Sequence, residues 1–337
     1  MNTTGLVKYA GTVAALAICS ACSGGSAVAP SSAAVNSAYI GRTLSLNGRL
    51  VTAARVNSPL PRYATILPER LTGHRKFEYI INDYGSFAGI FDYPKSDQQI
   101  GTINDVGGQG CTNVLFGYGK KIFWIVAAFN QIEEFKVPDR PIRSLSVSDG
   151  SMPSSCAMDT NGDLAVGILD GPSTGDIDLY KNATGSGTLI PTPLAEEFFD
   201  GYDNKGNLFA DGFTSSGNFG LVELPKGSNK AETITPSNAI QFPGSVQWDG
   251  KFMTVFDQIA NNLYQYTISG TKATLQGTVS FTTSSDCAQT WLVKGLVYCG
   301  DAGNNNGSVF KYPAGGSAIA VFTGNFDLPL GVTAAKR

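Results

Sequence analysis

Glycines that precede short apolar runs recur along this sequence at a nearly constant spacing, which constrains the fold more than any other feature. Six of them lie 46, 43, 44, 44 and 45 residues apart: Gly73, Gly119, Gly162, Gly206, Gly250 and Gly295. Four-stranded units that repeat every ~40–50 residues are typical of β-propeller blades. The sequence therefore predicts an all-β fold, a six-bladed β-propeller with four-stranded blades, and leaves five or seven blades as the alternative.

The same order of strands is expected in every repeat. The run after the glycine is followed by a polar loop and by a third strand, in which apolar and polar residues alternate as in a half-buried strand. Proline often follows this third strand, where pairing has to stop. The third strands are expected at residues 89–93, 131–135, 176–180, 220–224, 262–266 and 308–312.

After the outer strand of one blade, the chain enters the inner strand of the following blade. These inner strands begin with small residues, because they converge on a central channel. The last inner strand is formed by residues 329–334, and no equivalent strand precedes Gly73. We therefore expect the C-terminal strand to join the first blade beside residues 77–83. This pairing of the two ends of the array closes the ring and removes exposed strand edges.

The N-terminal segment has the features of an export signal. Lys8 precedes a short apolar run, residues 12–19, which falls below the roughly 20 residues needed to span a bilayer. The following residues, 19–25, look like a lipobox, which would make Cys22 the lipid-modified N-terminus after cleavage. Cys19 stands where such motifs usually have leucine, so modification at Cys19 and ordinary cleavage near residues 27–29 remain alternatives.

These patterns divide the chain into three parts. Residues 1–22 are expected to be a signal peptide, residues 23–72 a flexible linker and N-terminal extension, and residues 73–337 the propeller. Within the extension, residues 59–72 are expected to dock on the first blade. The predicted location is the extracytoplasmic cell envelope, with the protein anchored to a membrane by lipid; a secreted or periplasmic protein is the alternative.

Four cysteines remain beyond the export signal, and they are Cys111, Cys156, Cys287 and Cys299. An oxidising compartment permits disulfides, and four cysteines allow three pairings. Cys111 and Cys156 occupy equivalent places on neighbouring inner strands, while Cys287 and Cys299 lie on adjacent strands of one blade. Each pair is a candidate bridge, and buried free thiols are the alternative. Their spacing lacks a CxxC motif, which argues against a zinc site.

The repeats resemble NHL-type and SMP-30/gluconolactonase-like propellers. In particular, they resemble a group of uncharacterised bacterial extracytoplasmic (lipo)proteins whose blades have the same sequence pattern. The segments that carry the resemblance are residues 201–208, 223–227, 243–250, 311–316 and 328–331. The resemblance covers about residues 65–335. It implies the fold and not an activity, because propellers host lactonases, lyases, sensors and scaffolds.

Composition and motifs argue against several functions. The formal net charge of −3 gives no attraction to a phosphate backbone, so no nucleic-acid partner is expected. The single histidine, His74, lies in a basic turn, and a serine or cysteine nucleophile would need such a base beside it. We therefore predict no catalytic residue.

Acidic residues gather on one predicted face of the propeller. The loops between second and third strands share this face with the connections between blades. The acids there are Asp83, Asp105, Asp149, Asp170, Asp176, Glu196, Glu197, Asp200, Asp211, Asp257, Asp286, Asp301 and Asp327, and most Lys and Arg residues fall on the opposite face. Loops of like charge focus a negative potential over the channel mouth.

A cation site is the functional interpretation of this acidic face. The densest cluster is Glu196, Glu197 and Asp200, followed by Asp105, Asp286 and Asp83. Oxygen ligands suit Ca²⁺ or Mg²⁺. The alternative is turn chemistry, because Asp side chains accept hydrogen bonds from loop backbone.

The leading functional prediction is a non-enzymatic binding or scaffold module, anchored to a membrane by lipid, that acts through its acidic loop face. We expect a monomer with a protein or carbohydrate ligand. The alternative is a metal-dependent hydrolase of the lactonase kind with a cation at the channel mouth. A structural envelope protein with no small ligand is the third candidate.

Overall fold

The computed structural model describes the following residues: 43–46, 49–52, 64–66, 78–83, 87–94, 96–104, 106–120, 122–127, 131–137, 140–148, 151–169, 175–326 and 328–336. The chain divides into two compact units, Met1–Arg55 and Val56–Arg337. Across the described ranges the regular elements are strands, apart from one turn of 3-10 helix at Lys181–Ala183. No helix in these ranges is long and apolar enough to cross a membrane. Cys22 and Asp105 lie outside the described residues.

The second unit repeats one element, an antiparallel sheet of four strands. In the first three sheets, ordered from one edge to the other, the strands are β28 (Pro329–Lys336), β4 (Glu78–Asp83), β5 (Phe87–Phe91) and β6 (Gln99–Asn104); β7 (Gln109–Thr112), β9 (Ile122–Ala127), β10 (Gln131–Lys136) and β11 (Arg140–Leu145); and β12 (Pro153–Met158), β13 (Leu164–Ile168), β14 (Asp176–Tyr180) and β15 (Thr188–Pro191).

The next three sheets follow the same order. Their strands are β16 (Glu196–Tyr202), β17 (Leu208–Phe213), β18 (Phe219–Leu224) and β19 (Glu232–Pro236); β20 (Val246–Trp248), β21 (Met253–Asp257), β22 (Asn262–Ser269) and β23 (Lys272–Ser280); and β24 (Cys287–Val293), β25 (Leu296–Asp301), β26 (Asn306–Lys311) and β27 (Gly315–Phe322). A short parallel pairing between β19 and β23 joins the fourth and fifth sheets.

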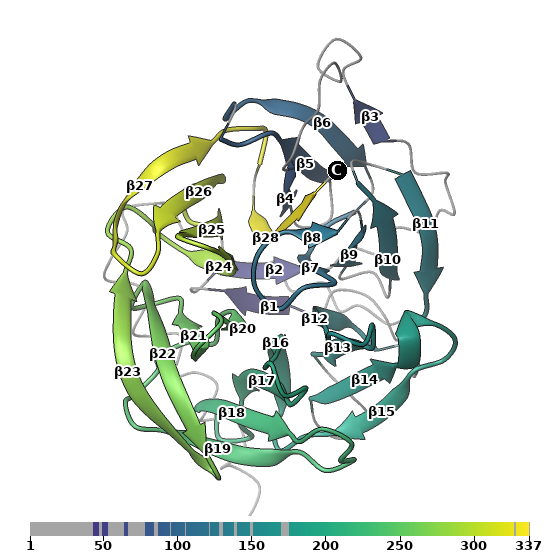
Figure 1. The fold of residues 1–337 in the computed structure, drawn as a ribbon, viewed down its shortest axis with the longest axis vertical. Coiled ribbons are helices and arrows are strands. Elements are labelled where there is room, and N and C mark those ends of the chain that lie inside the picture. Colours follow the sequence, from purple (N-terminus) through teal and green to yellow (C-terminus); the bar gives the residue numbers. More distant parts are fainter. Residues whose placement is uncertain are drawn as a thin grey trace, which may run out of the picture. The chain divides into compact units, whose positions relative to one another are not determined.

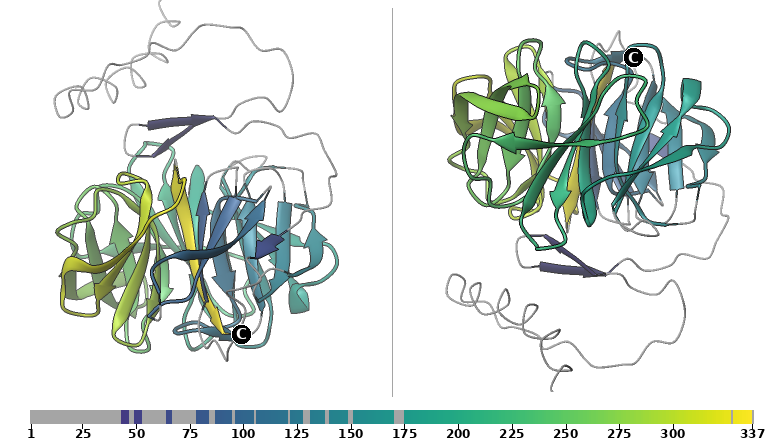
Figure 2. Two further views of the ribbon diagram at one scale, coloured as in Figure 1. Left: turned by 90° about the horizontal axis from the view of Figure 1, so that it is seen from above. Right: turned by 90° about the horizontal axis from the view of Figure 1, so that it is seen from below.

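Figure 1 shows these sheets arranged like spokes, with β28, β7, β12, β16, β20 and β24 toward the centre and β6, β11, β15, β19, β23 and β27 at the rim. We call the second unit, Val56–Arg337, the sheet-bearing unit because it contains the repeated four-stranded sheets. Seen from the side, the inner strands run across the thickness of this unit (Figure 2). The predicted third strands all coincide with observed strands, which are β5, β10, β14, β18, β22 and β26.

Four of the six glycines that defined the sequence repeat lie in tight turns between first and second strands, whereas Gly119 begins a two-residue strand and Gly73 lies outside the described residues. Gly162, Gly206, Gly250 and Gly295 have φ angles of 97°, 88°, 98° and 78°. This left-handed conformation is costly for residues with a Cβ atom and is readily adopted by glycine. The nearly constant spacing in the sequence thus reflects one turn geometry repeated from sheet to sheet.

The C-terminal strand lies in the first sheet. β28 pairs antiparallel with β4, with Val332 opposite Ile81 and Ala335 opposite Glu78. Its last residues also pair in parallel with the two-residue strand β8 (Gly119–Lys120), which belongs to the connection between β7 and β9. The C-terminal strand therefore pairs with residues 78–83, within the segment that the sequence predicted as its neighbour.

Three strands lie in the segment that the sequence assigned to a linker and extension. β3 (Ala64–Ile66) pairs with β6, the outer strand of the first sheet, which is the docking expected for residues 59–72. In the first unit, β1 (Thr43–Leu46) and β2 (Arg49–Thr52) form an antiparallel hairpin. The sequence signal for this hairpin is the dipeptide Asn47-Gly48, which commonly joins paired strands.

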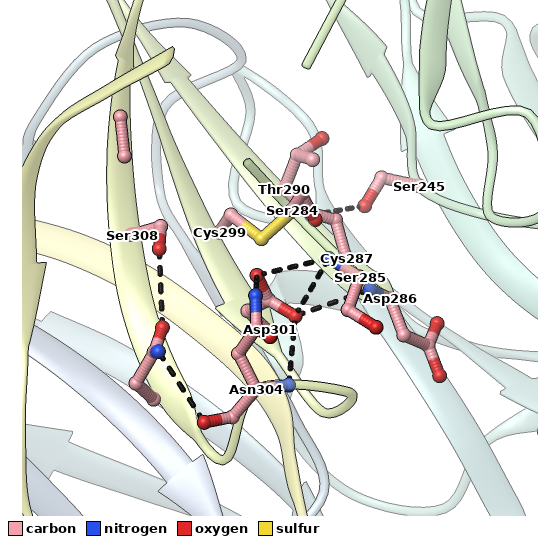
Figure 3. The surroundings of a disulfide bond; sticks show 12 residues. Ser245, Ser284, Ser285, Asp286, Cys287, Thr290, Cys299, Asp301, Asn304 and Ser308 are labelled. Carbon is pink, nitrogen blue, oxygen red and sulfur yellow. Dashed lines mark hydrogen bonds between the residues drawn. A yellow bond between two sulfur atoms is a disulfide. The ribbon is translucent and has the colours of Figure 1, made fainter. Parts of the chain in front are cut away.

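Two disulfides cross-link the sheet-bearing unit. Cys111–Cys156 joins β7 to β12 of the neighbouring sheet, with Cα atoms 5.7 Å apart. Cys287–Cys299 joins β24 to β25 within the sixth sheet, with Cα atoms 5.4 Å apart (Figure 3). These are the two candidate bridges of the sequence analysis, and the free-thiol alternative is wrong for all four residues.

Candidate functional site

The inner strands surround the centre of the sheet-bearing unit and contact one another in order. Neighbouring contacts join β28 to β7, β7 to β12, β12 to β16, β16 to β20, and β24 to β28. Between β20 and β24 the contact is made by side chains. Ser245 Oγ accepts a hydrogen bond from the Thr290 amide (2.5 Å), and Gln247 Oε1 accepts one from the Leu292 amide (2.7 Å).

Glutamine side chains connect inner strands that do not pair directly. Gln289 Oε1 accepts hydrogen bonds from the amides of Gly110 (2.9 Å) and Val332 (2.8 Å), and its Nε2 donates to Gly110 O (2.8 Å). Gln109 Nε2 donates to Phe198 O (2.9 Å). A carboxamide donates and accepts, so it can pair with backbone where strands diverge. Sequence reasoning missed this role, although glutamine recurs in three inner strands.

A loop from the second sheet crosses to the fifth and sixth sheets. This crossing loop, residues 113–118, connects β7 to β8. The Gly117 amide donates to Leu292 O (3.0 Å), and Trp291 Nε1 donates to Gly117 O (2.8 Å). Gln247 Nε2 donates to Leu115 O (3.1 Å). The loop therefore spans the central region and is held there by backbone and side-chain bonds.

A central pocket lies among the inner strands, with an empty volume of about 420 Å³ including its opening. Five inner strands and the crossing loop line it, and Phe199, Tyr202 and Trp291 are its aromatic wall. Three buried oxygens of lining residues have no hydrogen-bond partner among the described atoms: Thr112 Oγ1, Asp200 Oδ1 and Thr290 Oγ1. Aromatic, apolar and polar residues thus meet around the pocket, while these three oxygens have almost no accessible surface.

Two carboxyl groups of β16 meet at the edge of this pocket. Glu197 and Asp200 hydrogen-bond to each other. Ser154 Oγ donates to Glu197 Oε2 (2.7 Å), and Ser155 Oγ donates to Asp200 Oδ2 (2.8 Å). In a regular strand, side chains three residues apart point to opposite faces. A β-bulge between Glu197 and Phe199 shifts the register and brings both carboxyl groups to the same side.

Burial controls the protonation of this pair. It raises the pKa of Glu197 well above its ordinary value, and the neighbouring charge of Asp200 raises it further. Burial also raises the pKa of Asp200 to about 6, while hydrogen bonds from Ser155 and Glu197 oppose the shift. Of the two, Glu197 is therefore the group that holds its proton to higher pH, and Asp200 is the group that ionises first.

Gly167 of β13 makes room for Glu197. A Cβ atom at this position would lie 1.5 Å from Glu197 Oε2, so a larger residue would displace the carboxyl group. Glycine inside a strand weakens the strand, and it often marks the close approach of another group. The third sheet is thus shaped to admit a carboxyl group from the fourth.

The structure separates the predicted metal ligands. Glu197 and Asp200 lie together, whereas Glu196 is exposed at the start of β16. Asp286 is buried at the entry to the sixth sheet, Asp83 ends β4, and Asp105 lies outside the described residues. Within the described ranges, no group of three or more His, Cys, Asp or Glu side chains is arranged to hold a metal ion.

Sequence reasoning did not place Asp211 in this cluster. It lies on β17 and is completely buried, and burial raises its pKa well above the ordinary value. The Gly244 amide donates to Asp211 Oδ2 (3.1 Å), and Oδ1 has no partner among the described atoms. The sequence did contain a signal for Asp211. It lies near the end of the second strand of its sheet, as Asp257 and Asp301 do in theirs.

Most members of the predicted acidic face are buried side chains. Where burial is described, its members are buried except for Glu196: Asp176, Glu197, Asp200, Asp211, Asp257, Asp286 and Asp301 are each under 9% exposed. Asp257 Oδ2 accepts a hydrogen bond from the Gln241 amide (2.8 Å). Asp301 Oδ1 accepts bonds from the amides of Asp286 (3.1 Å) and Asn304 (3.2 Å) (Figure 3). For these two residues, the turn-chemistry alternative is confirmed.

We expect Asp301→Ala to lower the free energy of unfolding by ~2–4 kcal/mol. The substitution leaves buried amides without acceptors, and unmade bonds to a charged partner are the costly ones. Chemical denaturation of the two proteins measures the difference. Asp301→Asn keeps one acceptor oxygen, so a loss as large as that of Asp301→Ala would contradict this account.

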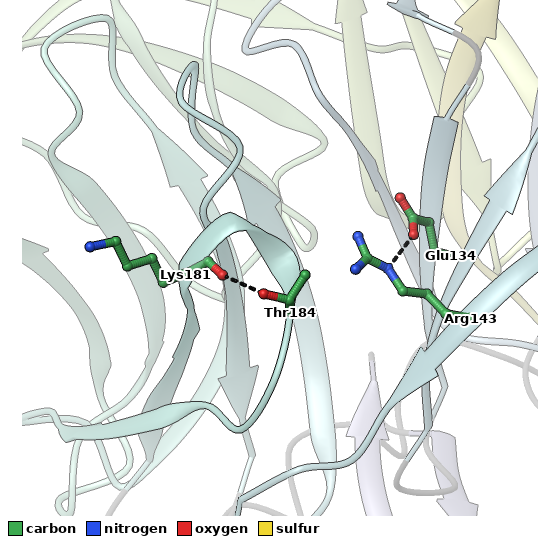
Figure 4. A network of polar contacts seen from close by, with 4 residues as sticks. All are labelled: Glu134, Arg143, Lys181 and Thr184. Atoms are coloured by element: carbon green, nitrogen blue, oxygen red, sulfur yellow. Dashed lines mark hydrogen bonds and ion pairs between the residues drawn. The ribbon is translucent and has the colours of Figure 1, made fainter.

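One charged pair at the rim, Arg143–Glu134, has a structural role. Arg143 Nε donates to Glu134 Oε2 (2.5 Å) between β10 and β11 (Figure 4). The same guanidinium lies 5.5 Å from the centre of the Trp124 ring. Nearby, Thr184 Oγ1 donates to Lys181 O (3.1 Å) and closes the turn after β14. These contacts hold outer strands and lie away from the pocket-lining residues.

Comparison with known proteins identifies the fold. No family model matches the chain, and no curated protein matches it. A protein of unknown function from Bacteroides caccae is 11% identical, with a TM-score of 0.58 over 78% of this chain and 100% of its own. The nidogen/laminin complex contains a chain that is 11% identical, with a TM-score of 0.59 over 77% of this chain and 98% of its own.

A functionally unknown protein from Desulfotomaculum acetoxidans is 9% identical, with a TM-score of 0.50 over 77% of this chain and 99% of its own. At these identities the likeness concerns the fold alone. Together with the repeated four-stranded sheets, it shows that this chain has the fold of a β-propeller.

Proposed function

We propose that this chain is an exported, lipid-anchored, six-bladed β-propeller that acts as a binding or scaffold module. The six four-stranded sheets are its blades. Two observations support a closed ring: β28 pairs with β4, and each inner strand contacts the next around the centre. The NHL- and SMP-30-like resemblance of the sequence belongs to this proposal as well.

The observation that carries the proposal is the pair of disulfides. Cys111–Cys156 and Cys287–Cys299 form from all four cysteines beyond the export signal. Disulfides persist in oxidising compartments and are rare in the reducing cytosol. Their presence supports export, and export supports the interpretation of Cys22 as a lipid-modified residue.

The ligand of the module is proposed to be cationic or carried on a cation. Asp200 is the acidic residue among those that line the central pocket. The predicted Ca²⁺ or Mg²⁺ site remains a proposal for Glu197 and Asp200. A protein partner is supported by the similar nidogen/laminin structure, which is a complex of two proteins. No feature of the described residues favours the metal-dependent hydrolase.

Substitution of Cys22 tests the anchor. We expect the full chain, expressed in a bacterial host, to fractionate with membranes and Cys22→Ala to shift to the soluble fraction, because the acyl chains are lost. Mass spectrometry of the mature N-terminus measures the modification directly. Cys19→Ala is the matched control and is expected to stay with the membranes. Release of Cys19→Ala instead, or retention of Cys22→Ala, would refute anchoring at Cys22.

A further inference from the structure

The topology of the sheet-bearing unit places two sets of turns on one face. In each sheet, antiparallel pairing brings the turn between the first and second strands to the same end as the turn between the third and fourth strands. Parallel pairings between neighbouring sheets, such as β19 with β23 and β28 with β8, give the sheets one orientation. These turns therefore share a face, which lies opposite the predicted acidic face.

Exposed cations gather on this face, which we call the basic face. Its members come from five of the six sheets and are Lys120, Lys136, Arg140, Lys181, Lys205, Lys226, Lys230, Lys251, Lys272, Lys294 and Lys311. None of them forms an ion pair with another described residue. Asp97 and Glu232 are exposed there as well. Asp159, Asp203 and Asp249 instead accept hydrogen bonds from backbone amides of their own turns. The basic face is therefore positive, although the chain has a formal net charge of −3.

The opposite face carries little exposed charge to offset these cations. Where burial is described, Glu196 is the exposed member of the predicted acidic face, and the other members are buried. A strand of six residues separates the two faces by ~20 Å, at ~3.3 Å per residue. This separation exceeds the Debye length, which is ~10 Å at an ionic strength of ~0.1 M. A partner at the basic face is therefore attracted by its cations and does not respond to the net charge of the chain.

The arrangement of the cations indicates an extended partner. They are spread over five sheets, and none of them lines the central pocket. All but Arg140 are lysines, whose ammonium groups act as point charges without the bidentate geometry of a guanidinium group. Such a surface suits many loosely placed anionic groups more than one shaped anion. Anionic lipid headgroups form a surface of this kind and attract clusters of basic residues.

We propose that the basic face lies against anionic lipid headgroups of the membrane to which the chain is anchored. The attraction orients the propeller, so that the loops between second and third strands point away from the membrane. This inference rests on the proposed lipid anchor for its location, and it names the surface that meets the membrane and the class of lipid that it meets.

Co-sedimentation of the full chain with lipid vesicles tests the proposal. The protein is Cys22→Ala, which has no acyl chains, and the vesicles contain equal parts of phosphatidylglycerol and phosphatidylcholine. We expect binding at least about tenfold tighter than to vesicles of phosphatidylcholine alone, because several basic residues contribute together. Neutral vesicles also control for attachment through the apolar N-terminal run. Sodium chloride at ~1 M shortens the Debye length to ~3 Å and is expected to release the protein.

Variants locate the surface. Replacement of four exposed lysines by glutamine is expected to weaken binding to the anionic vesicles at least about tenfold, in the variant Lys205→Gln/Lys226→Gln/Lys251→Gln/Lys294→Gln. A second variant tests the rest of the face if the first does not fold, Lys120→Gln/Lys181→Gln/Lys272→Gln/Lys311→Gln. The matched control makes the same change in net charge at exposed positions of the opposite face and is expected to keep the affinity within about threefold. It is Ser215→Glu/Ala239→Glu/Ile259→Glu/Asn325→Glu.

Several results would overturn the proposal: equal binding to both kinds of vesicle, binding that persists in ~1 M salt, or unchanged binding in the lysine variants. An equal loss in the opposite-face control would also overturn it, because net charge would then explain the binding. Tighter binding to duplex DNA than to the vesicles, at equal phosphate concentration, would overturn it in favour of a nucleic-acid partner.

The anchor is tested separately from the basic face. Membranes in the Cys22 experiment are washed with ~1 M sodium chloride, which screens the basic face and does not remove acylated protein. Absence of vesicle binding therefore leaves the anchored-scaffold proposal standing. Absence of acylation at Cys22 leaves the vesicle result standing, because that result is obtained without acyl chains.

Discussion

Loss of the Cys111–Cys156 bridge is expected to lower the free energy of unfolding by ~4 kcal/mol, following the loop-entropy relation for the 45 residues between the two cysteines. The bridge joins inner strands of neighbouring blades, which are otherwise held by packing and side-chain contacts. The variant Cys111→Ser/Cys156→Ser, compared with the oxidised wild type by chemical denaturation, measures the effect. In a thermal melt of a unit this large, the loss corresponds to a fall of about 10 °C.

The second bridge supplies the control. Cys287 and Cys299 are separated by 12 residues, and the same relation gives a smaller loss of ~3 kcal/mol for Cys287→Ser/Cys299→Ser. This bridge also links strands that already pair by hydrogen bonds. If its removal cost more than removal of Cys111–Cys156, the entropic account of the inter-blade bridge would be wrong.

The strand order could be predicted from the sequence because it depends on local chemistry. Turn glycines such as Gly162 and Gly206 need positive φ angles, and this requirement marks four of the repeats in the same place. Alternation of apolar and polar residues then locates the third strand. The C-terminal strand was predictable because one repeat lacked an inner strand of its own.

The site was harder to predict because it depends on long-range geometry. The charge pattern placed Glu197 and Asp200 in one cluster, and the two do lie together, but the pattern could not show that they are buried. The two carboxyl groups lie on the same side of the strand because of a β-bulge, and no residue pattern in β16 predicts that bulge. The space for Glu197 comes from Gly167 in another blade, 30 residues earlier in the chain. Similarly, the sequence assigns Asp301 to the acidic face, whereas in the structure its carboxylate accepts hydrogen bonds from the backbone amides of Asp286 and Asn304.

The buried carboxyl pair should make the protein less stable as pH rises. Burial raises the pKa of Asp200 from 3.8 to about 6, so between these values the unfolded chain loses a proton that the folded chain retains. The stabilisation present below pH 4 is therefore lost as pH rises to about 6, and the difference in pKa corresponds to ~3 kcal/mol. Glu197, whose pKa is raised further, extends the loss to higher pH.

Substitutions that mimic the protonated carboxyl groups isolate this effect. We expect Asp200→Asn to be more stable than the wild type by up to ~3 kcal/mol at pH 8 and to differ little at pH 4, because an amide keeps the size of the acid and does not ionise. Glu197→Gln should flatten the profile at higher pH in the same way. Urea denaturation from pH 4 to pH 9 measures the difference profiles, in which carboxyl groups common to both proteins cancel. An unchanged slope in Asp200→Asn would mean that the folded protein does not hold this carboxyl group away from water.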